Sequence, residues 1–164
     1  MPEKSLREFF RKYIEDTPEK GPVAEVKLWL CNLTNVVAVE VGLDGGRVFS
    51  VYITSRALKH LYDKKPAGEF FCLLDCLDEI ARYPEQIYKN MKSKRGDYCL
   101  VGKYNDSEYV CSVEIIANLS EAEVQIATGF RVRDRKYLRK YTLLWSRGTG
   151  NPHRNALDAP EGVY

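Results

Sequence analysis

The spacing of apolar residues changes once along this chain, and that change limits the folds open to it. Before the basic segment MKSKRG, the two longest apolar patterns, at 5–14 and 66–82, repeat with the period of an α-helix. After this segment the apolar residues alternate as in strands, which predicts strands at 98–104, 109–116 and 124–132. The links NDSE and NLSEAE are short and polar, so these three strands are expected to pair antiparallel in chain order.

The other predicted elements are shorter. Strands are expected at 26–31 and 48–53, and Thr54 or Ser55 is expected to cap a short helix that follows. The stretch NLTNVVAVEVG allows a strand or a helix ending near Gly42, and residues 137–145 allow a last helical turn and an edge strand. The order predicts an α+β fold, with N-terminal helices packed on one face of a three- to four-stranded antiparallel sheet and the other face open for a site.

The same patterns suggest three parts of the chain. Residues 1–47 are interpreted as an N-terminal helical and strand extension, 48–150 as the main domain, and 151–164 as a loose tail rich in polar residues. The chain has 164 residues and no apolar run long enough to span a bilayer, and its charged N-terminus lacks a signal-peptide core. We therefore expect a cytoplasmic protein that is not bound to a membrane.

Five cysteines occur, mostly within apolar stretches, and none forms a CxxC pair. They are expected to be reduced and unpaired, and no further Cys or His follows at the spacing of zinc ligands. The sequence also lacks a P-loop, a GxGxxG after a strand and an HExxH. No metal and no cofactor is predicted.

Charge is distributed unevenly, although the net charge is only +2. Residues 89–103 hold five bases against one acid, residues 131–147 hold seven bases against one acid, and the helix between 66 and 88 is acidic. A basic patch of this kind is typical of proteins that bind a phosphate backbone, and a solvated basic surface is the alternative.

His60 is one of two histidines, and helical geometry puts it on the polar side of its predicted helix with Arg56, Lys59 and Asp63. Two interpretations remain open from the residues. His60 is either an ordinary exposed histidine or a general acid or base, for which an imidazole is suited near neutral pH.

Several segments between Val48 and Trp145 resemble a nuclease superfamily in their order and spacing. They are VYITSRALKHL, ARYPEQIY, KRGDYCLVGKY, CSVEII, TGFRV and YLRK. The chain resembles the phage-type barnase–EndoU–colicin–RelE-like superfamily. That resemblance implies a barnase/RelE-like fold and a small metal-independent endoribonuclease, often a toxin, that cleaves RNA by attack of the ribose 2′-OH.

Carried over by this resemblance, His60 is the general acid or base, and Thr128 and Tyr137 complete the predicted catalytic group. Arg95 and Lys103 match the basic positions at the start of the sheet and would hold phosphate. Arg131 and Arg135, in the later basic segment, are added to this phosphate-binding set.

Thr128 shares strand parity with Val124, Ile126 and Phe130, so it is buried in the core unless a bulge precedes Phe130. Three functions from different classes therefore stay open. They are an endoribonuclease that is a toxin or phage-derived effector, a non-catalytic RNA-binding relative, and a protein–protein module bound by an acidic antitoxin or inhibitor.

Overall fold

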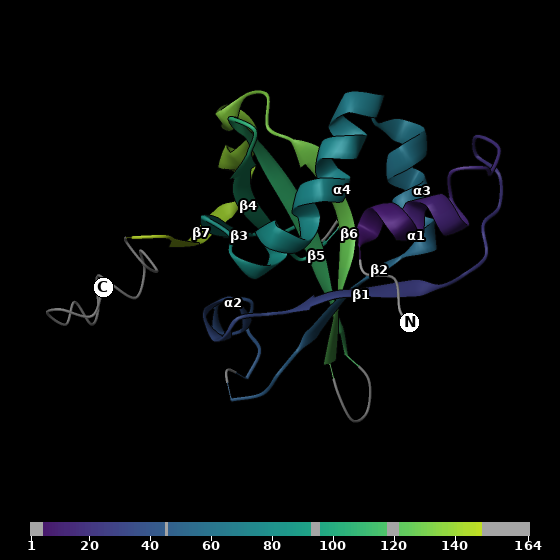
Figure 1. Ribbon diagram of the computed structural model, residues 1–164. Helices are drawn as coiled ribbons and strands as arrows, with labels where there is room; N and C mark the ends of the chain where they lie inside the picture. Colours follow the sequence, from purple (N-terminus) through teal and green to yellow (C-terminus); the bar gives the residue numbers. More distant parts are fainter. Residues whose placement is uncertain (1–4, 45, 93–95, 118–121, 149–164) are drawn as a thin grey trace, which may run out of the picture.

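Seven strands form one mixed sheet, and three helices, α1, α3 and α4, lie together on one of its faces in the residues described (Figure 1). The computed structural model describes residues 5–44, 46–92, 96–117 and 122–148. The helices are α1 (Leu6–Tyr13), α2 (Asn35–Glu40), α3 (Ser55–Lys64), α4 (Ala67–Arg82) and the 3₁₀ helix η1 (Arg135–Lys140). The strands are β1 (Lys27–Asn32), β2 (Ser50–Thr54), β3 (Gln86–Lys89), β4 (Tyr98–Tyr104), β5 (Ser107–Ala117), β6 (Ala122–Arg131) and β7 (Thr142–Ser146).

The sheet corrects the predicted fold class. The order of the strands is β1-β2-β6-β5-β4-β3-β7, and β2 pairs with β6 in parallel, so the sheet is neither purely antiparallel nor three- to four-stranded. The predicted β4–β5–β6 meander is present. The expectation was wrong because short links specify pairing only between successive strands. They give no information on the pairing of β2 with β6 or of β3 with β7, because these strands are far apart in the chain.

The parallel pair is narrow. Only Val51 and Tyr52 of β2 pair with β6, opposite Val124 and Gln125. On its other side β2 pairs antiparallel with β1, which brings a strand from the first 47 residues into the same sheet. Residues 151–164, the predicted tail, lie outside the described part of the chain.

Side-chain caps explain where the first helices begin. Ser5 accepts a hydrogen bond from the Glu8 amide at the start of α1, and Thr54 accepts one from the Ala57 amide at the start of α3. The ambiguous stretch after β1 is helical. It forms α2, which is followed by Gly42 at a positive φ of 81°.

The main core lies between α4 and the sheet. Leu73, Leu77 and Ile80 of α4 are each at most 3% exposed, and burying each such side chain contributes about 1.5–3 kcal/mol. Two glycines let the helix come this close. A Cβ on Gly102 would lie 2.9 Å from Ile80 Cγ1, and one on Gly129 would lie 3.1 Å from Leu77 Cδ2.

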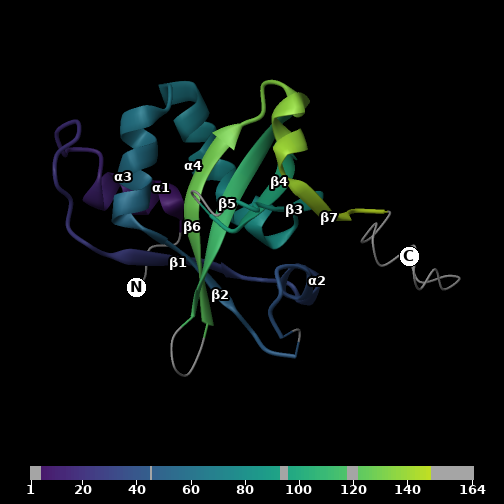
Figure 2. The same ribbon diagram turned by 180° about the vertical axis from the view of Figure 1, so that it is seen from behind.

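A smaller core lies on the opposite face of the sheet, where η1 packs (Figure 2). Its buried residues are Tyr88, Cys99, Val101, Val110 and Leu138. Leu138 comes from η1 and the others come from β3, β4 and β5. The face predicted to be open is therefore partly covered by the segment after β6.

All five cysteines are described and unpaired. Burial raises the pKa of the Cys31 thiol to about 11 and that of Cys76 to about 12, so both stay protonated at neutral pH. None of the helices in the described part of the chain has the length and apolar character needed to cross a membrane.

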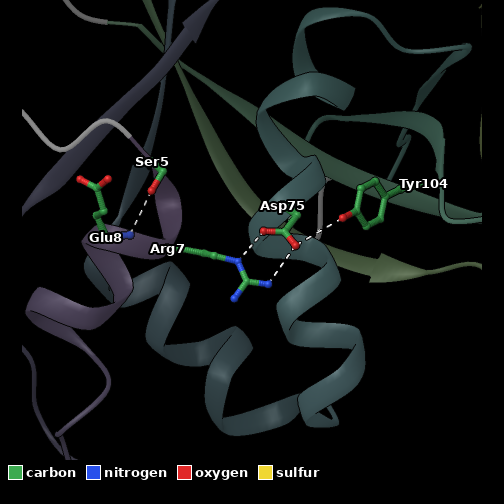
Figure 3. Close-up of polar contacts among 5 residues, drawn as sticks. All are labelled: Ser5, Arg7, Glu8, Asp75 and Tyr104. Atoms are coloured by element: carbon green, nitrogen blue, oxygen red, sulfur yellow. Dashed lines mark hydrogen bonds and ion pairs between the residues drawn. The ribbon is translucent and has the colours of Figure 1, made fainter.

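One polar cluster attaches α1 to the rest of the helical layer (Figure 3). The guanidinium of Arg7 donates to both carboxylate oxygens of Asp75 on α4, at 2.5 and 2.9 Å. The hydroxyl of Tyr104 on β4 donates to the same carboxylate at 3.3 Å. The hydrogen bond from Arg7 is the main reason that the pKa of Asp75 lies below its usual value.

We predict that Asp75→Asn lowers the melting temperature at neutral pH but not in strong acid. The native pKa of Asp75 is lowered, so its stabilisation is complete above the unfolded pKa of about 3.9 and is lost as the pH falls through the native value. Thermal unfolding of both proteins from pH ~7 to ~2 tests this. Glu79→Gln, an exposed change on the same helix, is the control. An Asp75→Asn deficit that is constant across this range would contradict the prediction.

Candidate functional site

A hollow of about 710 Å³ opens on the η1 side of the sheet, between the end of β6, η1 and the residues that follow β3. We call it the basic hollow. Its charged lining residues are five bases, Lys65, Lys92, Arg131, Arg133 and Lys140, and one acid, Asp134. Its other polar and aromatic lining residues are Asn90, Ser112, Thr128, Phe130, Tyr137 and Tyr141.

A β-bulge directs Thr128 into this hollow. Ser112 of β5 pairs with Thr128, but the next residue, Val113, pairs with Ile126, so Ala127 is extra. Ile126 therefore packs in the α4-side core, and Phe130 packs with the η1-side core. Because of this bulge, Thr128 and Ile126 point to opposite faces of the sheet although they are two residues apart. Thr128 is 7% exposed and lines the hollow together with Ser112.

The segment after β3 is held against the floor of the hollow by Asn90, which is itself buried. The side-chain Nδ2 of Asn90 donates to the Gly96 carbonyl at 2.9 Å. Its side-chain Oδ1 accepts from the backbone amide of Lys92 at 3.1 Å. Gly96 has a φ of 111°, and a Cβ there would lie 2.1 Å from the Ser112 hydroxyl oxygen. Only glycine suits this position. Lys92, whose backbone amide is held by the Asn90 side chain, lines the hollow.

The cations of the hollow fall into two groups. Arg133 and Lys65 both form ion pairs with the buried carboxylate of Glu69, the second at 3.9 Å. Lys92, Arg131 and Lys140 form no ion pair with another residue in the described ranges. The hollow therefore keeps a net positive charge that suits an anionic ligand.

Tyr137 lines the hollow and is 46% exposed. The Lys140 ammonium is 3.7 Å from the centre of its ring, and the Phe130 ring centre is 5.2 Å away. A hydrogen bond from Lys140 lowers the pKa of the Tyr137 hydroxyl. The neighbouring Tyr141 has a raised pKa, chiefly because it is buried. Tyr137 is thus the more acidic of these two phenols.

The residues predicted from sequence fall in three places. Thr128, Arg131 and Tyr137 are brought together in the basic hollow. Lys103 and Arg135 line a second hollow of about 610 Å³, where Arg135 is paired with Glu108 and donates to Gln86.

The remaining two predicted residues are His60 and Arg95. His60 is exposed on α3 and is absent from the residues that form this lining. Arg95 lies outside the described part of the chain.

Sequence reasoning missed several residues of the hollow. Lys92 and Lys140 belong to the two basic segments, so their charge was counted, but no pattern distinguished them from their neighbours. Glu69 was counted within the acidic helix, although it is only 7% exposed and faces the cations. Asn90 and Ser112 carry no sequence signal, because their role depends on contacts with Gly96, which is distant from Ser112 in the chain.

No protein-family model, no curated protein and no solved structure matches this chain. Likeness to the barnase–EndoU–colicin–RelE-like superfamily therefore stays a prediction from the motifs. In the described residues, no group of three or more His, Cys, Asp and Glu side chains is arranged to hold a metal ion.

We predict that Lys140→Met raises the pKa of Tyr137 toward the ordinary phenol value of about 10. The change removes the hydrogen bond that stabilises the phenolate. The measurement is an NMR titration with ¹³C in the tyrosine ring, in which Tyr137→Phe assigns the signal. Lys136→Met, which removes an exposed cation of the same η1, is the control. If the pKa of Tyr137 is the same in wild type, Lys140→Met and Lys136→Met, Lys140 does not lower it.

Proposed function

We propose that this chain is an endoribonuclease that binds RNA through the basic hollow and cleaves it without a metal ion. The observation that carries the proposal is the composition of the hollow. Five cations and one acid surround a buried threonine and an exposed tyrosine. Cations bind phosphates, and aromatic side chains stack on unpaired bases, so this lining suits an RNA strand better than a small neutral ligand.

The proposed reaction needs no external nucleophile. The 2′-oxygen of the ribose attacks the adjacent phosphorus, the bond from phosphorus to the 5′-oxygen breaks, and a 2′,3′-cyclic phosphate forms. A base accepts the proton of the 2′-OH, and an acid gives a proton to the leaving 5′-oxygen. Cations stabilise the charge that develops on the phosphate oxygens.

Residues of the hollow fit most of these roles. Tyr137, with its lowered pKa, is our candidate for proton exchange at the reacting oxygens. Thr128 offers a hydroxyl to a phosphate oxygen, while Lys92, Arg131 and Lys140 supply charge. His60 is the second candidate acid or base, and an RNA strand would have to extend from the hollow to the exposed side of α3 to meet it.

One observation favours a second function, which is RNA binding without cleavage. His60 does not line the hollow, so the strongest acid–base side chain is not among the residues that would hold phosphate. For either function we propose a cytoplasmic location. We also propose that a toxin or phage-derived effector of this kind is controlled by an acidic antitoxin or inhibitor, which would cover the same cations.

We predict that wild type cleaves cellular RNA in excess EDTA and leaves 2′,3′-cyclic ends. Loss of one acid–base group should cost about 10²–10⁴-fold in turnover, so Tyr137→Phe and His60→Ala are compared under identical conditions. Tyr137→Phe keeps the ring for stacking and removes only the hydroxyl. The measurement is the initial rate on a labelled oligoribonucleotide, with product ends identified by mass spectrometry.

Tyr83→Phe, a change at an exposed tyrosine that does not line the basic hollow, is the matched control and should retain full rate. Intact RNA with wild type on every substrate tried would contradict cleavage, and measurable RNA binding would then support the binding-only function. Equal rates for wild type, Tyr137→Phe and His60→Ala would show that neither side chain takes part.

We predict that Lys92→Gln and Arg131→Gln weaken RNA binding and make it less dependent on salt. Each cation that contacts a phosphate of a single strand contributes about 0.7 to the slope of log affinity against log salt. Fluorescence anisotropy at a series of salt concentrations gives the slope. Lys64→Gln removes an exposed charge that does not line the hollow and should leave the slope unchanged. Slopes equal to wild type in both hollow variants would remove these residues from the RNA contact.

A further inference from the structure

Glu69 is a buried acid beside a cluster of bases, and its position in the fold is fixed by three elements. It lies in the first turn of α4, where the helix dipole favours a carboxylate, and its side chain is only 4% exposed. One of its oxygens accepts from the Arg133 guanidinium. The other accepts from the Arg131 backbone amide at 3.2 Å and lies 3.9 Å from the Lys65 ammonium.

These contacts join three segments that line the basic hollow. Lys65 follows the end of α3, Arg131 ends β6, and Arg133 begins the connection to η1. The Arg133 side chain is 61% exposed, so its outer part is open to solvent while one guanidinium nitrogen is held by Glu69. An exposed arginine without such a partner would sample many rotamers. The buried carboxylate restricts it to one direction.

We propose that Glu69 is the positioning residue of the basic hollow, which holds Arg133 and Lys65 in the arrangement that the reacting phosphate requires. The inference rests on the proposed function. It has an unusual consequence, because a positioning carboxylate also neutralises part of the charge that attracts RNA. Glu69 therefore lowers affinity for RNA while it raises turnover.

The test separates these two effects with Glu69→Gln, which keeps the size of the side chain and an oxygen for the Arg131 amide. The variant should bind a labelled oligoribonucleotide at least as tightly as wild type at low salt. Its salt slope should steepen by about 0.7 for each cation that gains a phosphate contact. Turnover at saturating RNA should fall by about 10²-fold, the cost of misplacing a reacting group by about 1 Å.

Two further variants keep the result interpretable. Glu79→Gln removes the same charge from an exposed position on α4 and should change neither affinity nor turnover. Arg133→Gln should lower turnover as Glu69→Gln does, but it should also weaken binding. Because Glu69 acts partly through Arg133, the loss of turnover in the double variant should be smaller than the product of the two single losses.

The outcomes are distinct. Tighter binding with slower turnover supports the proposal, since a purely structural role would lower both together along with the melting temperature. If wild type binds and cleaves RNA and Glu69→Gln does the same, Glu69 has no positioning role although the proposed function holds. If Glu69→Gln loses affinity, turnover and thermal stability together, the positioning role is also wrong. If wild type neither binds nor cleaves RNA, both the proposed function and this inference are wrong.

Discussion

The close packing of α4 on the middle of the sheet is the contact on which the other features depend. Gly102 and Gly129 allow Ile80 and Leu77 to reach the strands, and a larger residue at either glycine would push the helix outward. The first turn of α4 carries Glu69, whose carboxylate meets the end of β6. The distance between helix and sheet therefore also sets the position of the cations at the hollow. The packing of the core and the arrangement of the site therefore both depend on where α4 lies.

A second constraint comes from a single extra residue in β6. If β6 had no bulge at Ala127, residue alternation would direct Thr128 to the same side as Ile126, toward α4 and the apolar core. The bulge instead lets one strand supply apolar residues to both cores and a hydroxyl to the hollow. The bulge comes just after the residues of β6 that pair with β2, which are Val124 and Gln125. The sheet is thus continuous, but β6 packs into different cores before and after the bulge.

The sequence predicts the local elements well and the long-range ones poorly. Apolar period predicts α1, α4 and the β4–β6 meander, because each is defined by neighbours in the chain. It does not predict β3, which has four residues just after Pro84, or the pairing of β2 with β6. β3 is too short to show a clear alternation, and the pairing of β2 with β6 depends on packing between distant segments.

The site divides in the same way. Basic segments and the TGFRV motif predict Thr128 and Arg131, and these residues do meet Tyr137 in one hollow. The prediction for Thr128 depended on a bulge that the residues allow but do not specify. Glu69 could not be predicted, because its burial and its three partners come from α3, β6 and the connection to η1. Lys103 and Arg135 share basic character with the hollow but line another one.

The narrow parallel pair between β2 and β6 has a consequence for the order in which the chain folds. The β4–β6 meander needs only short loops to close. Val51 and Val124, in contrast, are separated in the chain by α3, α4 and strands β3 to β5. Closing this long loop costs chain entropy, and two residue pairs alone do not compensate for that cost before the helices have packed. We expect the meander and α4 to form the folding nucleus, with β1 and β2 added afterwards as a unit. The part of the basic hollow that β5 and β6 supply, with Ser112, Thr128 and Arg131, would then form before the N-terminal strands have joined the sheet.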